Sequence, residues 1–156
     1  MFRVTAAQMS RTAGWCLSLA LALGAGEASA LFIVNQPWVV PAAKGQSTAV
    51  YMDLTSTEGA ALVGASSDAS ASVSIRGPRG ASSNARLALP AREMIRLAPN
   101  GYRLVLDRTT RPIKRGERVR LTLTIEGADG SRQEIGVDAE ARFDSPLDAE
   151  RRTHQH

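Results

Sequence analysis

Hydrophobic and polar residues alternate along several segments of the chain, as they do in half-buried β-strands. The alternation runs through residues 48–54, 118–125 and 134–143. The turn sequence Gly127-Ala-Asp-Gly130 lies between the last two segments. These two segments therefore predict an antiparallel hairpin.

Further short strands are predicted where small groups of apolar residues lie between glycine- or proline-containing turns. These strands are at residues 31–34, 38–40, 61–65, 72–76, 94–97 and 102–107. Residues 66–71 are small and polar, so we predict a loose loop there. Helical patterns are nearly absent after residue 30. The chain is therefore predicted to be all-β, an antiparallel sandwich or barrel.

The first thirty residues have the pattern of a cleaved secretory signal peptide. Arg3 and Arg11 precede an apolar run at residues 15–25, and the segment ends in Ala-Ser-Ala30. We predict cleavage after Ala30 and a periplasmic or secreted protein. The apolar run is too short to span a bilayer, so no membrane span is expected.

Three regions follow from this interpretation. They are a signal peptide at 1–30, a β-sandwich domain at 31–144 and a disordered tail at 145–156, which is charged and lacks a core pattern. The single cysteine, Cys16, lies within the predicted signal. A mature chain without thiols has no disulfide, no thiolate metal site and no cysteine nucleophile.

The positive charge is unevenly distributed. Without the signal the chain keeps 17 basic and 14 acidic residues, a net +3. Residues 76–120 carry a net +9 and residues 121–156 a net −4. Such polarity can steer a protein toward an acidic partner or an anionic surface. The alternative is that solvent-facing strand positions merely happen to be arginine. Nucleic acid is not an expected partner, because Tyr102 is the only aromatic in the basic region.

Enzyme chemistry is not expected from this sequence. Both histidines lie in the tail, and no nucleophile elbow is present. Asp53, Glu58 and Asp68 are the carboxylates of the N-terminal half, but nothing marks two of them as an acid/base pair. No set of residues fills the roles of nucleophile, base and orienting group.

The tail offers one weak metal-binding candidate. His154-Gln-His156 supplies two imidazoles that can chelate Cu(II), Ni(II) or Zn(II). The alternative is a solvated terminus with incidental histidines. The methionines after the signal are Met52 and Met94, and Met52 falls on the core face of its predicted strand, where packing is expected.

Several segments, in order and spacing, resemble the periplasmic copper chaperone family PCu(A)C. They are Trp38, Ala49-Val-Tyr-Met-Asp-Leu-Thr-Ser-Thr57, Leu62-Val-Gly-Ala-Ser-Ser67, Leu89-Pro90, Leu97-Ala-Pro-Asn-Gly-Tyr102, Arg111-Pro-Ile-Lys114 and Gly116-Glu-Arg-Val-Arg-Leu-Thr-Leu-Thr-Ile125. The resemblance implies a cupredoxin-like antiparallel β-sandwich of Greek-key type. It also implies copper as the bound metal and, as partner, a periplasmic protein of copper-site assembly, notably that of cytochrome oxidase. We expect a monomer.

The resemblance also implies a Cu(I) site made of a first His, a later Met and a closing His-x-Met after Gly-Tyr. In this sequence the first His position is Arg76, and the closing pair falls on Arg103 and Val105. Residues 80–89 contain no methionine. Because arginine stays protonated, two cations would stand where Cu(I) belongs, so we expect the site to be lost.

Two hypotheses remain open. In the first, the protein keeps a role in copper trafficking through His154 and His156. In the second, it is a metal-free binding or adaptor module, and a patch of Arg76, Arg79 and Arg103 docks an acidic protein, an anion or a lipid headgroup. If their strands are neighbours, the guanidinium groups of Arg76 and Arg103 should lie close together on one exposed edge.

Overall fold

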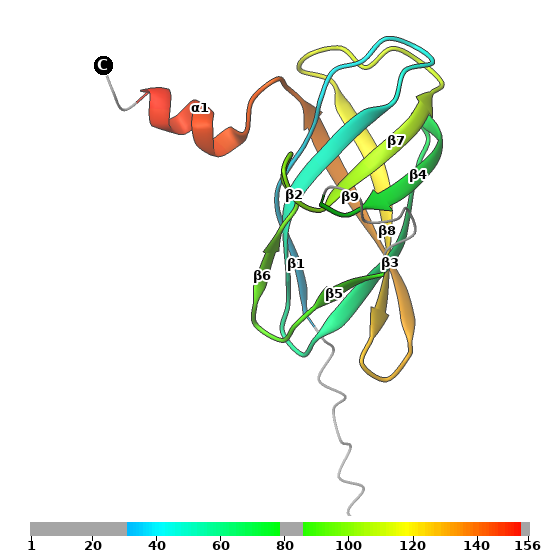
Figure 1. The fold of residues 1–156 in the computed structure, drawn as a ribbon, viewed down its shortest axis with the longest axis vertical. Helices are drawn as coiled ribbons and strands as arrows, with labels where there is room; N and C mark the ends of the chain where they lie inside the picture. Colours follow the sequence, from blue (N-terminus) through cyan, green and yellow to red (C-terminus); the bar gives the residue numbers. More distant parts are fainter. Residues whose placement is uncertain (1–30, 79–85, 154–156) are drawn as a thin grey trace, which may run out of the picture.

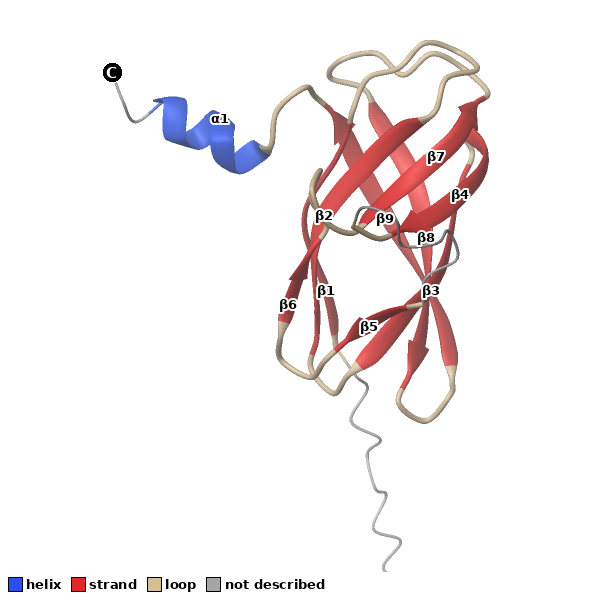
Figure 2. Cartoon of the chain, viewed as in Figure 1, coloured by secondary structure: helices blue, strands red, loops and turns tan. Residues whose placement is uncertain are grey.

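A computed structural model describes residues 31–78 and 86–153 of the chain (Figure 1). The predicted signal peptide, Arg79 and the two histidines lie outside these residues. Within them the chain forms nine strands and one helix (Figure 2). The elements are β1 (Phe32–Val39), β2 (Thr48–Ser56), β3 (Ala60–Ser67), β4 (Ser70–Arg76), β5 (Leu87–Leu89), β6 (Met94–Arg96), β7 (Arg103–Thr109), β8 (Arg118–Gly127), β9 (Arg132–Ala141) and α1 (Pro146–Thr153).

The strands form one strongly curved sheet in the order β4-β7-β2-β1-β9-β8-β3-β5, and β6 pairs with β2 outside this path. β3 and β4 stand near opposite ends of the order, yet a two-residue turn joins them and they pack side by side. The sheet therefore curls into a nearly closed, barrel-like sandwich (Figure 1). The all-β prediction is confirmed.

One pairing departs from the predicted antiparallel arrangement. β1 and β9 run parallel and are joined through Trp38 opposite Glu140 and Val39 opposite Ala141. The other strand pairs of the described residues are antiparallel. Parallel neighbours need a long connection between them, and here the connection is almost the whole domain.

The alternation in the sequence produces a single hydrophobic core. The face that carries Val50, Met52 and Leu54 points inward, and Met52 is 2% exposed, which confirms its packing role. β8 and β9 form the predicted hairpin, in register from Arg118 opposite Glu140 onward. Burial of such side chains is the main force that holds the fold.

β1 replaces the two strands predicted at 31–34 and 38–40. The pairing of β1 with β2 continues through Pro37 by means of a register shift between Asn35 and Trp38. Gln36 adopts a φ of 48° there. Proline cannot donate to the ladder, so a bulge is where a strand can accommodate it.

Two further differences concern short segments. The loop predicted at residues 66–71 is instead the end of β3, a turn at Asp68-Ala69 and the start of β4. Small residues such as serine and alanine give little hydrophobic contrast, so their alternation is hard to recognise. β5 was not predicted, because three residues before Pro90 are too short for a periodic pattern.

The predicted disordered tail also needs correction, because residues 146–153 form helix α1. The Ser145 carbonyl accepts hydrogen bonds from the Asp148 and Ala149 N–H groups, and Pro146 occupies the first helical position, where proline is favoured. Asp148 lies in the first turn and two arginines lie in the last, which suits the helix dipole. None of the helices in the described ranges has the length and apolar character needed to cross a membrane.

Candidate functional site

The two arginines at the positions that the resemblance gives to histidines lie opposite each other. Arg76 is the last residue of β4, Arg103 is the first of β7, and they are register partners in this antiparallel pair. Directly opposed Cβ atoms are about 5 Å apart. Ile75 and Leu104, the residues next to them, point into the core. Both arginines therefore belong to the outer face of the sheet, and the condition that their strands be neighbours is met.

Arg76 belongs to a small polar network. Its Nε donates a hydrogen bond of 3.3 Å to Ser74 Oγ, which donates one of 2.9 Å to Asp107 Oδ2. Arg76 Nη2 also lies 3.8 Å from Asp107 Oδ1. The side chain of Arg76 therefore extends along β4 toward a carboxylate that compensates its charge.

Arg103 differs from Arg76 in this respect. Among residues 31–78 and 86–153, no carboxylate oxygen lies within 4 Å of its guanidinium, whereas Arg76 has Asp107. Its positive charge acts on a neighbour: burial raises the pKa of Tyr51, and the charge of Arg103 partly opposes that rise. The outer face at this point thus carries one compensated and one uncompensated cation.

Val105 is the residue to which the resemblance assigns the closing methionine. It lies opposite Ser74 on β4 and opposite Ala49 on β2. None of these three side chains offers a sulfur or an imidazole. Arg76, Arg103 and Val105 thus form a continuous patch on β4 and β7, while Arg79, the third arginine of the expected patch, is outside the described residues.

An aromatic pair extends the same row of residues across the sheet. Tyr51 on β2 follows the pair Val50–Leu104 in the β2–β7 register, which brings it beside Arg103. Trp38 on β1 is the register partner of Tyr51, and their ring centroids are 4.7 Å apart at an interplanar angle of 43°. Both rings are buried. Sequence alone does not assign the pair to the site. The available signal is that Tyr51 lies on the face of its strand opposite Val50 and Met52.

Helix α1 and the sheet line an open pocket of about 220 Å³ beside Trp38. Trp38, Asp53 and Arg96 line it from the sheet, and Leu147 and Arg151 line it from the helix. The body of α1 extends away from the sheet, and none of its residues is buried (Figure 1). The segment predicted to be a disordered tail therefore borders the outer face at Trp38.

Asp53, weighed above as a catalytic carboxylate, forms a bidentate ion pair. Arg96 donates from Nε to Asp53 Oδ1 at 2.9 Å and from Nη2 to Oδ2 at 3.1 Å. Asp53 is only 8% exposed, so the pair compensates a nearly buried negative charge. Its hydrogen bond and charge raise the pKa of Arg96. Asp53 thus has a structural partner.

The described residues contain no group of three or more His, Cys, Asp or Glu side chains that could hold a metal ion. Met94, the second methionine after the signal, is half exposed on β6 opposite Thr55, four residues along β2 from Tyr51. It is therefore not part of the Arg76–Arg103 patch. His154 and His156 stay candidates predicted from the sequence.

Comparison with known proteins identifies the family and the fold of the chain. The model of a family described as LpqE-like, a lipoprotein by its description, matches residues 33–138. The apo PCuAC domain from PmoF1 is similar, with a TM-score of 0.63 and 25% identity over 74% of this chain and 94% of that one. The Cu(I) form of DR1885 from Deinococcus radiodurans has a TM-score of 0.53 and 27% identity over 76% of this chain and 85% of that one.

The copper-bound PCuAC domain from PmoF2 shares the fold, with a TM-score of 0.60 and 22% identity over 71% of this chain and 92% of that one. No curated protein matches the chain. The fold and the family assignment therefore rest on the family model and on these structures.

Proposed function

The chain belongs to the LpqE-like family, which shares the PCuAC fold, and we propose that it is an exported relative of the copper chaperones in which the Cu(I) position has become a site for an anionic group. One observation carries the proposal. Arg76 and Arg103 are direct cross-strand partners at the two positions that the resemblance gives to histidines. The family background supports a non-enzymatic binding role rather than catalysis.

The chemistry of these side chains is unfavourable for Cu(I). A guanidinium is protonated at any physiological pH and has no lone pair to donate to a metal. The charge of Arg103, which has no carboxylate within 4 Å among the described residues, would repel a cation bound beside it. Val105 supplies no thioether in place of methionine. Restoring affinity would therefore require both the removal of charge and the addition of ligands.

The same features favour a carboxylate. Arg103 has no carboxylate within 4 Å among the described residues, and Arg76 holds Asp107 only at 3.8 Å. A guanidinium fork binds a carboxylate in two-pronged geometry. Ser74 adds a hydroxyl on the neighbouring strand. The ligand that fits this patch is an acidic side chain of a partner protein, because the patch lies on the open outer face of the sheet rather than in a deep cavity.

A second candidate function keeps copper as the cargo. His154 and His156 directly follow helix α1, whose residues line the pocket beside Trp38. One similar structure is named as a Cu(I) form. Two imidazoles on one short segment would form a low-affinity site that a partner's ligands could complete.

Titration with Cu(I) against a competing chelator separates these functions. If the Cu(I) site is lost, we expect that neither residues 31–156 nor a version ending at Asp144 binds Cu(I) tightly. The triple variant Arg76→His/Arg103→His/Val105→Met should gain at least about tenfold in affinity. The matched control Arg76→Gln/Arg103→Gln/Val105→Met removes the same charges without adding imidazoles and should gain less.

Tight binding by the version ending at Asp144 would overturn the proposed loss of the site. Binding by the longer form alone would support the tail histidines and the copper role. For the anionic ligand, Arg103→Gln should weaken binding of a labelled twenty-residue polyglutamate more than Arg92→Gln does, because Arg92 is exposed and lies outside the patch. Equal effects of the two substitutions would contradict the carboxylate site.

A further inference from the structure

The arginines on the strands and on α1 are mostly compensated locally. Six of them have a carboxylate oxygen within 4 Å, namely Arg76, Arg96, Arg120, Arg132, Arg151 and Arg152. Arg86, just before β5, and Arg142, just after β9, are paired in the same way. Their charges therefore contribute little to a long-range field. This agrees with the view that many arginines on the sheet need no functional explanation.

One end of the barrel is different. Two segments meet there: the loop at residues 40–47, and residues 108–117, which are the end of β7 and the loop after it; we refer to them as the two loops. They carry Lys44, Arg108, Arg111, Lys114 and Arg115 but only one carboxylate, Glu117. We call these five cations the basic end. Arg111 pairs with Glu117, whereas the other four have no carboxylate within 4 Å in the described part of the chain. Those four side chains are all exposed.

The basic end is held together by hydrogen bonds between its two loops. The Gly45 N–H donates to the Thr109 carbonyl at 2.8 Å, and Thr109 Oγ1 donates to the Ala43 carbonyl at 2.8 Å. Ala42 and Ile113 exchange both of their backbone hydrogen bonds. The Lys114 N–H donates to Glu117 Oε2 at 3.0 Å. The cations thus project from a tied scaffold, which reduces the ordering cost of binding.

The nearest other acidic turn does not compensate these loops. Asp68 lies in the β3–β4 turn, where its carbonyl accepts a hydrogen bond from Thr110 Oγ1. Its carboxylate acts on Arg120: hydrogen bonding to Asp138 chiefly raises the pKa of Arg120, and the charge of Asp68 adds to that rise. Arg120 lies on the outer face of β8, beyond the basic end.

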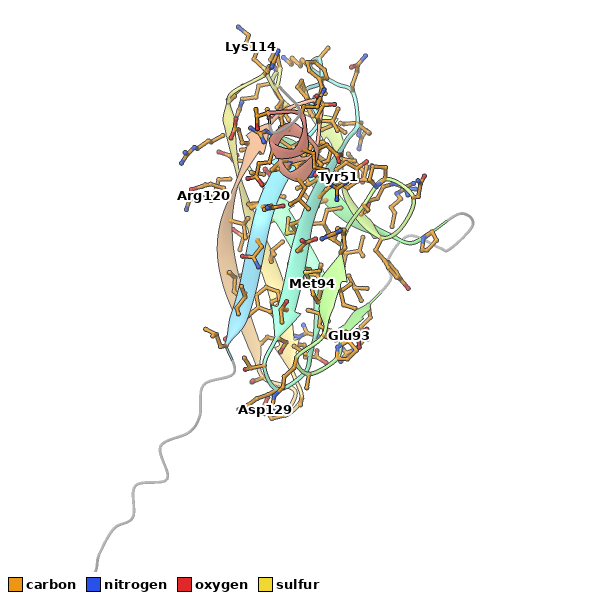
Figure 3. All side chains as sticks on the ribbon, turned by 90° about the vertical axis from the view of Figure 1, so that its left-hand side faces the viewer. Tyr51, Glu93, Met94, Lys114, Arg120 and Asp129 are labelled. Atoms are coloured by element: carbon orange, nitrogen blue, oxygen red, sulfur yellow. The ribbon has the colours of Figure 1, made fainter. Side chains whose placement is uncertain are left out.

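Unpaired positive charge is therefore concentrated at one end of the long axis of the described part of the molecule. Figure 3 places Lys114 at one end and Glu93 and Asp129 at the other. β1 also begins at the end opposite the basic loops (Figure 1). Any attachment through residues before Leu31 would leave the basic end pointing away from the attachment point.

We propose that the basic end docks an acidic segment of a partner protein. Charge complementarity supports a polyanion, and a protein fits better than a lipid surface. Leu31, Ile33 and Met94, three of the large exposed apolar residues of the described chain, lie on or next to β1 and on β6, away from the two loops. Phe143 lies near the basic end, because the adjacent end of β9 is hydrogen-bonded to Gly116. One apolar side chain does not make the extended apolar face by which surface-bound proteins anchor in a bilayer. This docking does not depend on the proposed Arg76–Arg103 site or on copper.

The test uses residues 31–156 and a labelled twenty-residue polyglutamate, followed by fluorescence anisotropy at low and physiological salt. The variant Lys44→Gln/Lys114→Gln/Arg115→Gln should lose affinity by about tenfold or more, because electrostatic steering depends on clustered charge. The control Arg92→Gln/Arg132→Gln/Arg151→Gln removes the same number of exposed charges elsewhere and should change affinity by less than about twofold.

Three outcomes would overturn the proposal. One is no binding by the native protein, and another is an equal loss in both triple variants, which would indicate diffuse charge. The third is tighter binding to vesicles of phosphatidylcholine and phosphatidylglycerol than to the peptide, abolished by the basic-end variant, which would assign the surface to a membrane. A loss in the basic-end variant with full retention in Arg103→Gln would leave this proposal intact while the Arg76–Arg103 site failed.

Discussion

Arg103 lies directly opposite Arg76 on the outer face of the sheet, yet only Arg76 has a carboxylate within 4 Å among the described residues. Two like charges at adjacent positions destabilise a strand pair unless a counter-charge is near. Asp107 supplies that counter-charge on one side. The unmatched charge of Arg103 therefore makes this part of the outer face a place where a negative group gains more than a metal ion does.

The neighbouring tyrosine offers a direct readout of that charge. Arg103→Gln should raise the pKa of Tyr51 further, because the charge that opposes the effect of burial is removed. Ultraviolet titration of phenolate formation measures it in a Tyr102→Phe background, in which Tyr51 is the remaining tyrosine. Arg92→Gln serves as the control. An unchanged titration of Tyr51 in Arg103→Gln would mean that the guanidinium points elsewhere.

Acid sensitivity should arise in part from the loop of the basic end. The hydrogen bond from the Lys114 N–H, followed by the charge of Arg111, holds the pKa of Glu117 below its ordinary value of 4.5. A depressed pKa in the folded state means that ionised Glu117 stabilises the fold above pH 4.5. That stabilisation is lost as the pH falls through the lower, folded-state pKa.

Urea unfolding at pH 7 and at pH 3 tests this expectation. Glu117→Gln should lower stability at pH 7 and shrink the difference between the two pH values. Glu58→Gln, which alters a carboxylate with no ion pair among the described residues, is the comparison. A pH dependence identical to that of the native protein in Glu117→Gln would remove Glu117 from the explanation.

Helix α1 should shield Trp38 without holding the fold together. Trp38 is the only tryptophan after the predicted signal, and it lines the pocket that α1 borders. Ending the chain at Asp144 should therefore shift its fluorescence to longer wavelength. The helix has no fully buried residue, so the cost in unfolding free energy should stay below about 1 kcal/mol. An unshifted emission spectrum would indicate that α1 does not cover Trp38 in solution.

The strongest strand predictions were those with full-length alternation. The hairpin of β8 and β9 and the inward face of β2 follow from every second residue being apolar. The failures have a common physical origin, namely weak local contrast. Serines and alanines at residues 66–71 carry little hydrophobic signal, and an eight-residue helix such as α1 has only about two turns over which to display a period.

The sequence predicted which residues of each strand belong to the candidate site, but it did not predict their contacts with residues on other strands. Arg76 and Arg103 could be identified from neighbouring residues in each strand, because the family pattern is local. The partners Asp107 and Tyr51 could not, since both depend on the register between strands distant in sequence. The difference between a compensated and an uncompensated arginine is likewise a property of register, which only the folded sheet fixes.

The parallel contact between β1 and β9 bears on the order in which the chain can fold. Trp38 and Val39 pair on one side with the neighbouring strand β2, but their partners on the other side lie about a hundred positions later in the sequence. Contacts so distant in sequence slow folding, because the loop between them must close first. The N-terminal strand can therefore complete its pairing only after nearly all of the domain is available, so under the proposed export the sheet would stay open until the last strand arrives.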